Sequence, residues 1–239
     1  MNEVGCLDFC PELARLYAAG RTTGSSGKQF DLGSCSTVNN LVILRNLCLT
    51  LKPSRSLEVG LASGGSCLAI ASFYRETLPK PQCRHVAVDP FQTTHWERAG
   101  IEAIQRAGLA DYVEVRETFS CWELPKLAEE GSQFDLVYID GSHLFEDVFV
   151  DAYFVARLLA ERGVVAFDDC RDPHVSKVIK FIRSNLKSSL LEKNLSPFRA
   201  DCGKPLKYRA ARLLGRTQMT AFQRTGAVAR PWDAAFYDF

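Results

Sequence analysis

The side chains best suited to chemistry in this sequence are three aspartates and a histidine: Asp140, His143, Asp168 and Asp169. Asp140 directly follows one short apolar run, and the two adjacent aspartates directly follow another. Carboxylates held close together repel one another unless a cation or a proton neutralises them. Their oxygens are hard ligands that suit Mg²⁺, with Mn²⁺ or Ca²⁺ as alternatives. If the fold gathers these groups, we expect a cation site with a histidine beside it to accept a proton.

A strand–helix–strand unit would gather them. The runs Leu136–Ile139 and Val164–Phe167 have the length and composition of buried strands. Between them, apolar residues recur at helical spacing, at Leu144, Val148, Ala152, Val155 and Leu159. A helical crossover makes the two strands parallel and adjacent, with their ends about 5 Å apart. The acids would then meet at the carboxyl edge of the sheet, where open α/β sheets bind ligands.

A glycine-containing loop follows an earlier strand. Residues 57–66 read LEVGLASGGS, which places Gly60, Gly64 and Gly65 between a strand and a helix. Glycine lets the backbone turn tightly and lets a ligand approach it closely. The spacing departs from the G-x-G-x-x-G dinucleotide fingerprint, and the loop lacks the lysine of a phosphate-binding loop. A purely structural turn is the alternative interpretation.

Two acids accompany this loop. Asp89 ends the next strand, His85–Val88, where it is placed to accept hydrogen bonds from ribose hydroxyls. Glu58 lies inside the first strand, Ser56–Val59, and is costly to bury unless it pairs with a positive or hydrogen-donating group. The amino group of a cofactor that carries an amino acid would provide that partner.

Strand and helix patterns alternate along the chain, which indicates a doubly wound α/β sheet of mostly parallel strands. Strands are expected at 56–59, 85–88, 112–115, 136–139 and 164–167, with weaker candidates at 197–200 and 217–222. Helices are expected at 11–19, 41–51, 67–78, 96–107 and 144–159, and from Pro173 onward. We interpret residues 1–35, which include a turn-rich stretch at 20–27, as an N-terminal helical extension, and residues 36–239 as one domain.

Composition narrows the class of protein. Lys and Arg number 29 against 28 Asp and Glu, a net charge of +1, so nothing indicates a nucleic-acid partner. No segment resembles a signal peptide or a membrane span, which predicts a cytoplasmic protein. The nine cysteines are scattered and never spaced Cys-x-x-Cys, so most are expected to be small buried hydrophobic residues, and no zinc site is expected. We interpret a basic C-terminal group as a solvated face: Lys204, Lys207, Arg209, Arg212 and Arg216.

The order of these motifs resembles that of class I S-adenosylmethionine-dependent methyltransferases. The motifs that carry the resemblance are E-x-G-x-x-x-G-x-S from Glu58, Val-Asp at Asp89, and FDLVYIDG at 134–141. Within that superfamily, IDGSH at 139–143 with VAFDD at 165–169 resembles the macrocin O-methyltransferase-like group, which is related in fold to catechol O-methyltransferases. The likeness covers about residues 36–182. It implies a Rossmann-like sheet of seven strands with helices on both faces.

The resemblance also assigns roles to residues. The methionine end of the cofactor would be lined by Glu58, Gly60, Ala62, Gly64 and Ser66. Asp89 would bind the ribose, Asp140 would also contact the cofactor, and the adenine would be contacted by Thr118, Phe119 and Ser120. Asp140, Asp168 and Asp169 match metal-ligand positions, for which Mg²⁺ is the expected ion. His143 matches the position of the base that takes the substrate proton.

The sequence therefore predicts a Mg²⁺-dependent enzyme that uses S-adenosylmethionine to methylate a hydroxyl of a small acceptor, such as a sugar, a glycoside or a catechol-like natural product. The alternatives are a nicotinamide-dependent Rossmann-fold oxidoreductase and a non-catalytic cofactor-binding protein of the same fold. The missing fingerprint glycine argues against the first, and the retained acids and His143 argue against the second. No membrane partner is expected. The sequence leaves open a homodimer, with the N-terminal segment packed across it or closed over the pocket.

Overall fold

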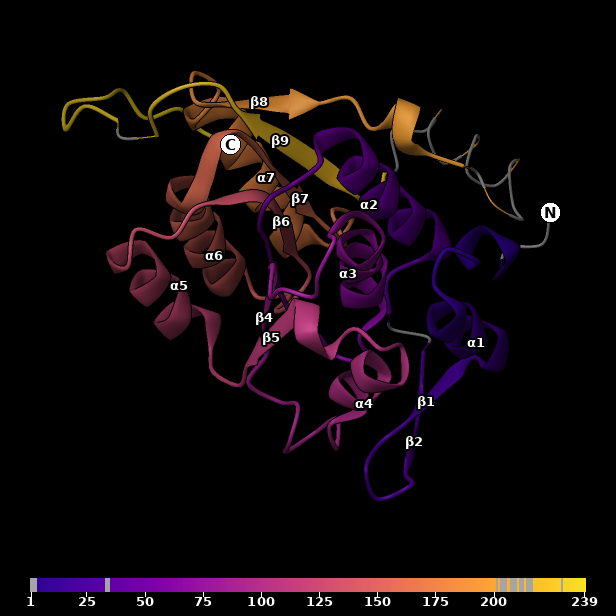
Figure 1. The fold of residues 1–239 in the computed structure, drawn as a ribbon. Helices are drawn as coiled ribbons and strands as arrows, with labels where there is room; N and C mark the ends of the chain where they lie inside the picture. The colour runs from indigo at the N-terminus through magenta and orange to yellow at the C-terminus, as the bar shows by residue number, and fades with distance from the viewer. Residues whose placement is uncertain are drawn as a thin grey trace.

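A seven-stranded sheet forms the centre of the structure (Figure 1). A computed structural model describes residues 4–32, 35–200, 202, 206, 210, 213, 217–228 and 230–239. The strand order is β5-β4-β3-β6-β7-β9-β8, and β9 runs antiparallel to both neighbours whereas the other pairs are parallel. The strands are β3 (Ser56–Val59), β4 (His85–Val88), β5 (Val113–Arg116), β6 (Phe134–Ile139), β7 (Leu159–Phe167), β8 (Leu190–Lys193) and β9 (Thr220–Arg224). The predicted doubly wound sheet of seven mostly parallel strands is confirmed.

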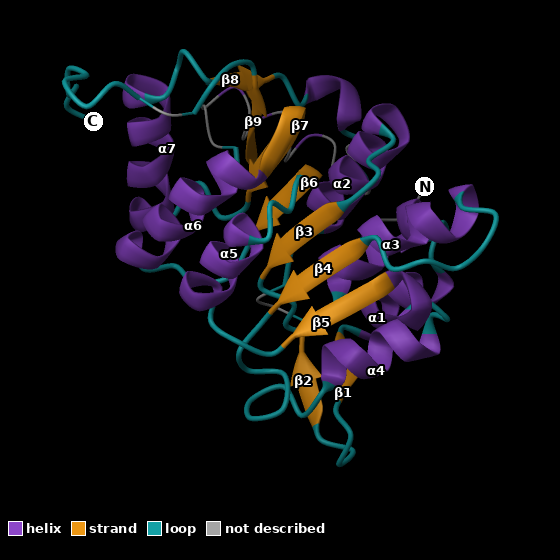
Figure 2. Ribbon diagram, turned by 60° about the vertical axis from the view of Figure 1, so that its left-hand side comes forward, coloured by secondary structure: helices purple, strands orange, loops and turns teal. Residues whose placement is uncertain are grey.

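Helices cover both faces of this sheet (Figure 2). One apolar core unites side chains of α1 (Pro11–Ala19), α2 (Val38–Leu51), α3 (Gly65–Thr77) and α4 (Ala99–Arg106). A second core, on the other face, unites side chains of α5 (Ser120–Glu129), α6 (Phe145–Leu158) and α7 (Pro173–Asn185). Short 3₁₀ turns lie at η1 (Val4–Leu7), η2 (Ala110–Tyr112) and η3 (Ser196–Phe198). Because both faces are covered, β3 and β4 are buried along their whole length, as expected of central parallel strands.

The N-terminal segment packs into the first of these cores. Leu7, Leu13 and Leu16 belong to the same apolar cluster as the side chains of α2 and α3. The stretch expected to be turn-rich contains an antiparallel hairpin, β1 (Arg21–Thr23) with β2 (Gln29–Asp31), so the segment is not purely helical. A domain boundary at residue 35 stays a prediction.

Several elements differ from the sequence-based expectation. Neither α5 nor β8 is expected from the patterns, because Pro125 lies inside α5 and two of the four residues of β8 are exposed. The weak strand candidate at 197–200 is instead the turn η3, and the candidate at 217–222 begins only at Thr220. The helix α4 begins at Ala99, so Trp96 precedes it.

Cysteine usage also departs in part from the expectation. Cys10, Cys48 and Cys67 are fully buried, as expected of small hydrophobic residues. Cys6 and Cys202 instead form a disulfide that joins the N-terminal segment to the C-terminal part of the chain. Disulfides persist mainly in oxidising compartments, so this pairing does not favour the predicted cytoplasmic location.

Two further expectations concern membranes and the basic C-terminal group. Across the described residues, no helix is both long and apolar enough to cross a membrane. The basic residues Lys204, Lys207, Arg209, Arg212 and Arg216 lie outside the described residues.

The sheet reverses its direction of winding between β3 and β6. The chain runs from β3 outward to β4 and β5, then returns to β6 on the opposite side of β3. Such a switch point opens a crevice beyond the carboxyl ends of the strands. Gly60 follows β3 at this point with φ +92°, and a Cβ on it would lie 2.3 Å from the carbonyl oxygen of Asp140. A residue without a side chain is therefore required where the glycine loop meets the end of β6.

Replacing Gly60 by Ala should destabilise the protein by about 2–4 kcal/mol, because a left-handed φ and a steric overlap with backbone each cost about 1–2 kcal/mol. Gly27→Ala is the matched control, since Gly27 has φ +89° with open space where its Cβ would lie. It should lose only about 1 kcal/mol. Chemical denaturation of both variants measures the difference, and equal losses would contradict the steric requirement at Gly60.

Candidate active site

The carboxyl ends of β6 and β7 carry the predicted acids. Asp140 directly follows β6, and its backbone N–H donates to the carbonyl of Val59 in β3 (2.9 Å). Asp168 directly follows β7, and its N–H donates to the carbonyl of Ile139 (3.0 Å). These bonds extend the parallel ladder beyond the last strand residues and fix both acids relative to β3. The parallel, adjacent pairing of the two strands that the sequence predicts is confirmed.

Asp140, His143 and Asp169 form one open cluster. Three ligand atoms, one from each side chain, lie within 4.8 Å of one another. Nε2 of His143 is 3.1 Å from Oδ2 of Asp169, and the Gln218 amide donates to Oδ1 of the same carboxylate at 3.1 Å. The His143 side chain is 51% exposed, and a cleft of about 490 Å³ lies beside it. The cluster can therefore meet a small molecule from solvent.

The third predicted metal ligand, Asp168, is turned away from this cluster. Its carboxylate is buried, accepts hydrogen bonds from the Tyr138 hydroxyl and the Asn40 amide (2.7 Å), and accepts another from the backbone N–H of Asp169 (2.8 Å). Adjacent residues at the end of a strand point to opposite sides. The chain bends at Asp169, where φ is +47°, but the bend turns only Asp169 toward His143. The three aspartates are thus neighbours, but the carboxylate of Asp168 does not belong to the cluster that Asp140, His143 and Asp169 form.

Burial sets the electrostatics of the inner acids. Loss of hydration, and then the charge of Asp168, raise the pKa of Asp140 well above its usual range. Burial also raises the pKa of Asp168, against the hydrogen bonds from Tyr138 and Asn40. The pKa of Tyr138 is raised by burial and by both aspartates, so its hydroxyl keeps its proton and donates. A group of buried acids of this kind holds a proton or a cation at neutral pH.

Asp89 holds the glycine loop. Its Oδ2 accepts hydrogen bonds from the backbone of Leu61 (3.1 Å) and Ala62 (2.7 Å) and from the Gln92 amide (3.1 Å). Its Oδ1 accepts the backbone N–H of Phe91 (2.7 Å). The carboxylate therefore orders the loop that follows β3, while the predicted contact with a ribose stays a prediction.

The predicted cofactor residues at the loop ends lie at helix starts. Gly64 adopts a left-handed conformation and precedes α3, and Ser66 lies buried in its first turn. Phe119 precedes α5, directly after Thr118 and before Ser120. Its half-exposed ring packs edge-on against Phe91 (5.8 Å between centroids) and Trp122 (5.1 Å). Phe91 and Trp122, which flank the predicted Phe119 in this exposed aromatic row, were not predicted from the sequence.

Glu58 lies apart from the exposed site. Its side chain has no exposed surface and its carboxylate faces His85 rather than solvent (Oε1 to Nε2, 3.5 Å). A cofactor could contact it only if the loop above rearranged. The predicted contact with the methionine end stays a prediction.

The N-terminal segment and α2 supply site residues that sequence reasoning missed. Ser36 Oγ donates to Asp140 Oδ2 (2.8 Å), and the Tyr17 hydroxyl donates to the carbonyl of Ser36 (2.5 Å). Asn40 is buried in the first turn of α2, a helix with several other polar residues, so no local signal distinguished it. Tyr138 lies two residues before Asp140, hence on the same face of β6. The segment before residue 36 thus contributes directly to the site.

Comparison with known protein families shows which domain this part of the chain resembles. Residues 57–170 match the family model described as a methyltransferase domain. A search of curated proteins finds no match. Residues 57–170 thus match a methyltransferase domain, in agreement with the enzyme class predicted from the sequence. The macrocin-like subgroup stays a prediction.

Several solved structures of similar fold are described as O-methyltransferases. The enzyme from Bacillus cereus in complex with S-adenosylhomocysteine has a TM-score of 0.64 and 16% identity, over 92% of this chain and 91% of that chain. A protein from Klebsiella pneumoniae assigned as an O-methyltransferase has a TM-score of 0.63 and 20% identity, over 90% of each chain. TomG from Streptomyces achromogenes, involved in tomaymycin synthesis and solved with S-adenosylmethionine, has a TM-score of 0.52 and 18% identity, over 80% and 82% of the chains.

Replacing Tyr138 by Phe should lower the free energy of unfolding at neutral pH by about 1–3 kcal/mol, because buried Asp168 loses a hydrogen-bond donor. Tyr112→Phe is the matched control, since Tyr112 is buried in the same core but lies outside the hydrogen-bond network of the acids. Urea denaturation at pH 7 compares the two variants. A loss in Tyr138→Phe no greater than in the control would show that the hydroxyl does not stabilise the acids.

Proposed function

We propose that this chain transfers a methyl group from S-adenosylmethionine to a hydroxyl oxygen of a small acceptor bound beside Asp140 and Asp169. The observation that supports this most directly is the open Asp140–His143–Asp169 cluster at the switch point of a methyltransferase fold. The named structural neighbours with bound S-adenosylhomocysteine or S-adenosylmethionine add support for the cofactor. A sugar, a glycoside or a catechol-like natural product would offer the neighbouring oxygens that such a cluster can orient.

The cofactor would lie along the carboxyl ends of β3, β4 and β5. We assign its methionine end to the loop residues Gly60, Ala62, Gly64 and Ser66, its ribose to Asp89, and its adenine to Thr118, Phe119 and Ser120. The absence of a side chain at Gly60, where a Cβ would strike backbone, fits a loop that a ligand approaches closely. The exposed ring of Phe119 fits a planar base, because offset and edge-on aromatic contacts are favourable. When bound, the cofactor supplies an electrophilic methyl group.

A divalent cation fits the open cluster. The carboxylates of Asp140 and Asp169 are hard ligands that suit the predicted Mg²⁺, with Mn²⁺ as an alternative. When bound, such an ion would lower the pKa of an acceptor hydroxyl. Asp168 could join as a ligand only by releasing Tyr138 and Asn40. In the arrangement described here it instead positions Asp140 through the shared Tyr138 hydroxyl.

His143 is the residue we assign to accept the proton of the acceptor hydroxyl. Its imidazole is half exposed at the cleft, and the Asp169 carboxylate orients it through Nε2. A positioned histidine of this kind contributes about 10²–10⁴-fold to a proton transfer near neutral pH. Holding the acceptor oxygen in line with the methyl group is the second contribution, since positioning alone supplies up to roughly 7–11 kcal/mol in well-oriented systems.

Titration of S-adenosylhomocysteine into chelator-treated protein, followed by calorimetry, tests the proposal. We expect saturable binding in the micromolar range, with an affinity or heat that changes when Mg²⁺ or Mn²⁺ is present. Asp169→Asn should keep the binding but lose the effect of the cation, because it removes one of two carboxylate ligands. Glu146→Gln, an exposed acid in the first turn of α6, is the matched control and should keep both.

Two outcomes would contradict parts of the proposal. Absence of binding by a demonstrably folded protein, together with binding of a nicotinamide dinucleotide in the same assay, would overturn the cofactor assignment. An unchanged cation effect in Asp169→Asn would overturn the assignment of the open cluster as the metal site and leave the cofactor assignment standing.

A further inference from the structure

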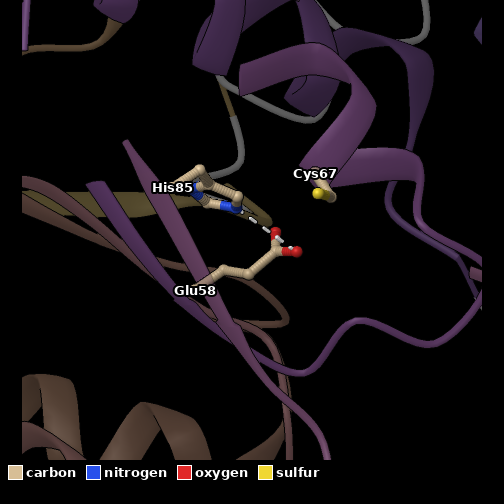
Figure 3. Close-up of side chains that lie close together, drawn as sticks. All are labelled: Glu58, Cys67 and His85. Atoms are coloured by element: carbon tan, nitrogen blue, oxygen red, sulfur yellow. Dashed lines mark ion pairs between the residues drawn. The ribbon is translucent and has the colours of Figure 1, made fainter. Parts of the chain in front are cut away.

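A second cluster of potential ligands lies beneath the glycine loop, separate from the open site. Glu58 on β3, His85 on β4 and Cys67 on α3 converge between the sheet and the helix (Figure 3). One ligand atom from each side chain lies within 4.8 Å of the other two, and Nε2 of His85 is 3.5 Å from Oε1 of Glu58. All three side chains have no exposed surface.

The polar atoms of this cluster are not satisfied by the protein. Both carboxylate oxygens of Glu58 and Nε2 of His85 lack a hydrogen-bond partner among the described residues. A buried polar atom without a partner costs about 1–3 kcal/mol, and more when it is charged. Most buried polar groups in proteins have a hydrogen-bond partner, whereas here Nε2 of His85 and Oε1 of Glu58 make only a long ion pair of 3.5 Å, which indicates a missing occupant.

The rest of the histidine is held in place. Nδ1 of His85 is 2.8 Å from the Ser56 hydroxyl oxygen, which also accepts a hydrogen bond from the Tyr74 hydroxyl (2.9 Å). This chain of hydroxyl groups fixes the ring so that Nε2 faces Glu58. Histidines that bind metals are commonly oriented in this way, with the second ring nitrogen hydrogen-bonded to a neighbouring group.

We propose that Glu58, Cys67 and His85 bind a divalent transition-metal ion, with Zn²⁺ as the ion that best matches one carboxylate, one thiolate and one imidazole. Three atoms within 4.8 Å of one another always leave a point no further than about 2.8 Å from each. Zinc bonds to these ligand types are about 2.0–2.3 Å long, so modest side-chain movements complete the set. This site is independent of the proposed methyl transfer.

Charge balance supports a dication in this position. A carboxylate and a thiolate together carry two negative charges, which one divalent ion neutralises within an otherwise apolar core. A single proton between Glu58 and His85 is the competing occupant, in which case Cys67 is only a small buried hydrophobic residue.

The location indicates what the ion would do. Glu58 lies two residues before Gly60, and Cys67 lies three residues after Gly64, in the first turn of α3. A bound ion would therefore join the two ends of the glycine loop to β4. Because no ligand is exposed, the ion would enter as the chain folds, and its binding would add to the stability of the fold.

Refolding the chain with Co²⁺ tests the site, because a cobalt–thiolate bond gives near-ultraviolet charge-transfer absorption that carboxylate and imidazole ligands do not give. We expect one thiolate-bound Co²⁺ per chain, with the band lost in Cys67→Ser. The band should persist in Cys48→Ser, another fully buried free cysteine, and in Asp169→Asn, which removes a ligand of the open cluster. A band absent from the refolded wild type, or retained in Cys67→Ser, would overturn the proposal.

A second measurement covers the case in which Cys67→Ser does not fold. The Asp169→Asn variant, whose own Cys67 is intact, is refolded with Zn²⁺, with Mg²⁺ or with chelator, and its melting temperature is compared. Zn²⁺ should raise the melting temperature while Mg²⁺ leaves it unchanged, because the thiolate selects the softer ion. Equal melting temperatures with Zn²⁺ and with chelator would overturn the site, whatever the outcome of the cofactor titration.

Discussion

The close approach of two backbone segments at the switch point is the constraint on which the site depends. β3 and β6 are parallel neighbours, so the loop after one strand must pass against the residue after the other. That contact leaves no room for a side chain at Gly60, beside the carbonyl of Asp140. As a result, the glycine loop that would hold a cofactor and the first acid of the open cluster occupy one rigid junction. Any ligand bound to one is therefore next to the other.

Buried carboxylates are the second constraint on the fold. Their hydrogen-bond partners differ on the two sides of the glycine loop. Beside the cleft, Asp168 receives hydrogen bonds from Tyr138, Asn40 and its own neighbour, so its charge has protein partners. Beneath the loop, Glu58 has none of these, and His85 is the nearest group that could share a charge with it. The acids beside the cleft thus have hydrogen-bond donors, whereas the carboxylate beneath the loop lacks them.

The sequence predicted the sheet well because parallel strands carry strong local signals. Apolar runs such as Val164–Phe167, ended by acids, indicated both the strands and their adjacency. The details of the site were harder to predict, because they depend on where a side chain turns after its strand ends. Nothing in the order Asp168-Asp169 indicates that only the second carboxylate meets His143, since that follows from a positive φ at Asp169. Residues from distant segments, such as Ser36 and Asn40, also bind the acids, and no local sequence pattern indicates that they do so.

The two clusters differ in their ligand types and in their exposure to solvent, and these two properties decide which ions they would select. The open cluster has two carboxylates and a half-exposed imidazole, a set that suits hard, readily exchanged cations at a site of chemistry. The closed cluster replaces one carboxylate by a thiol and excludes solvent, a set that suits a borderline ion held permanently. Because β3 and the glycine loop link the two, an ion in the closed cluster would hold rigid the junction beside the open cluster. The ion in the closed cluster would then stabilise the fold, and the ion in the open cluster would take part in the proposed reaction.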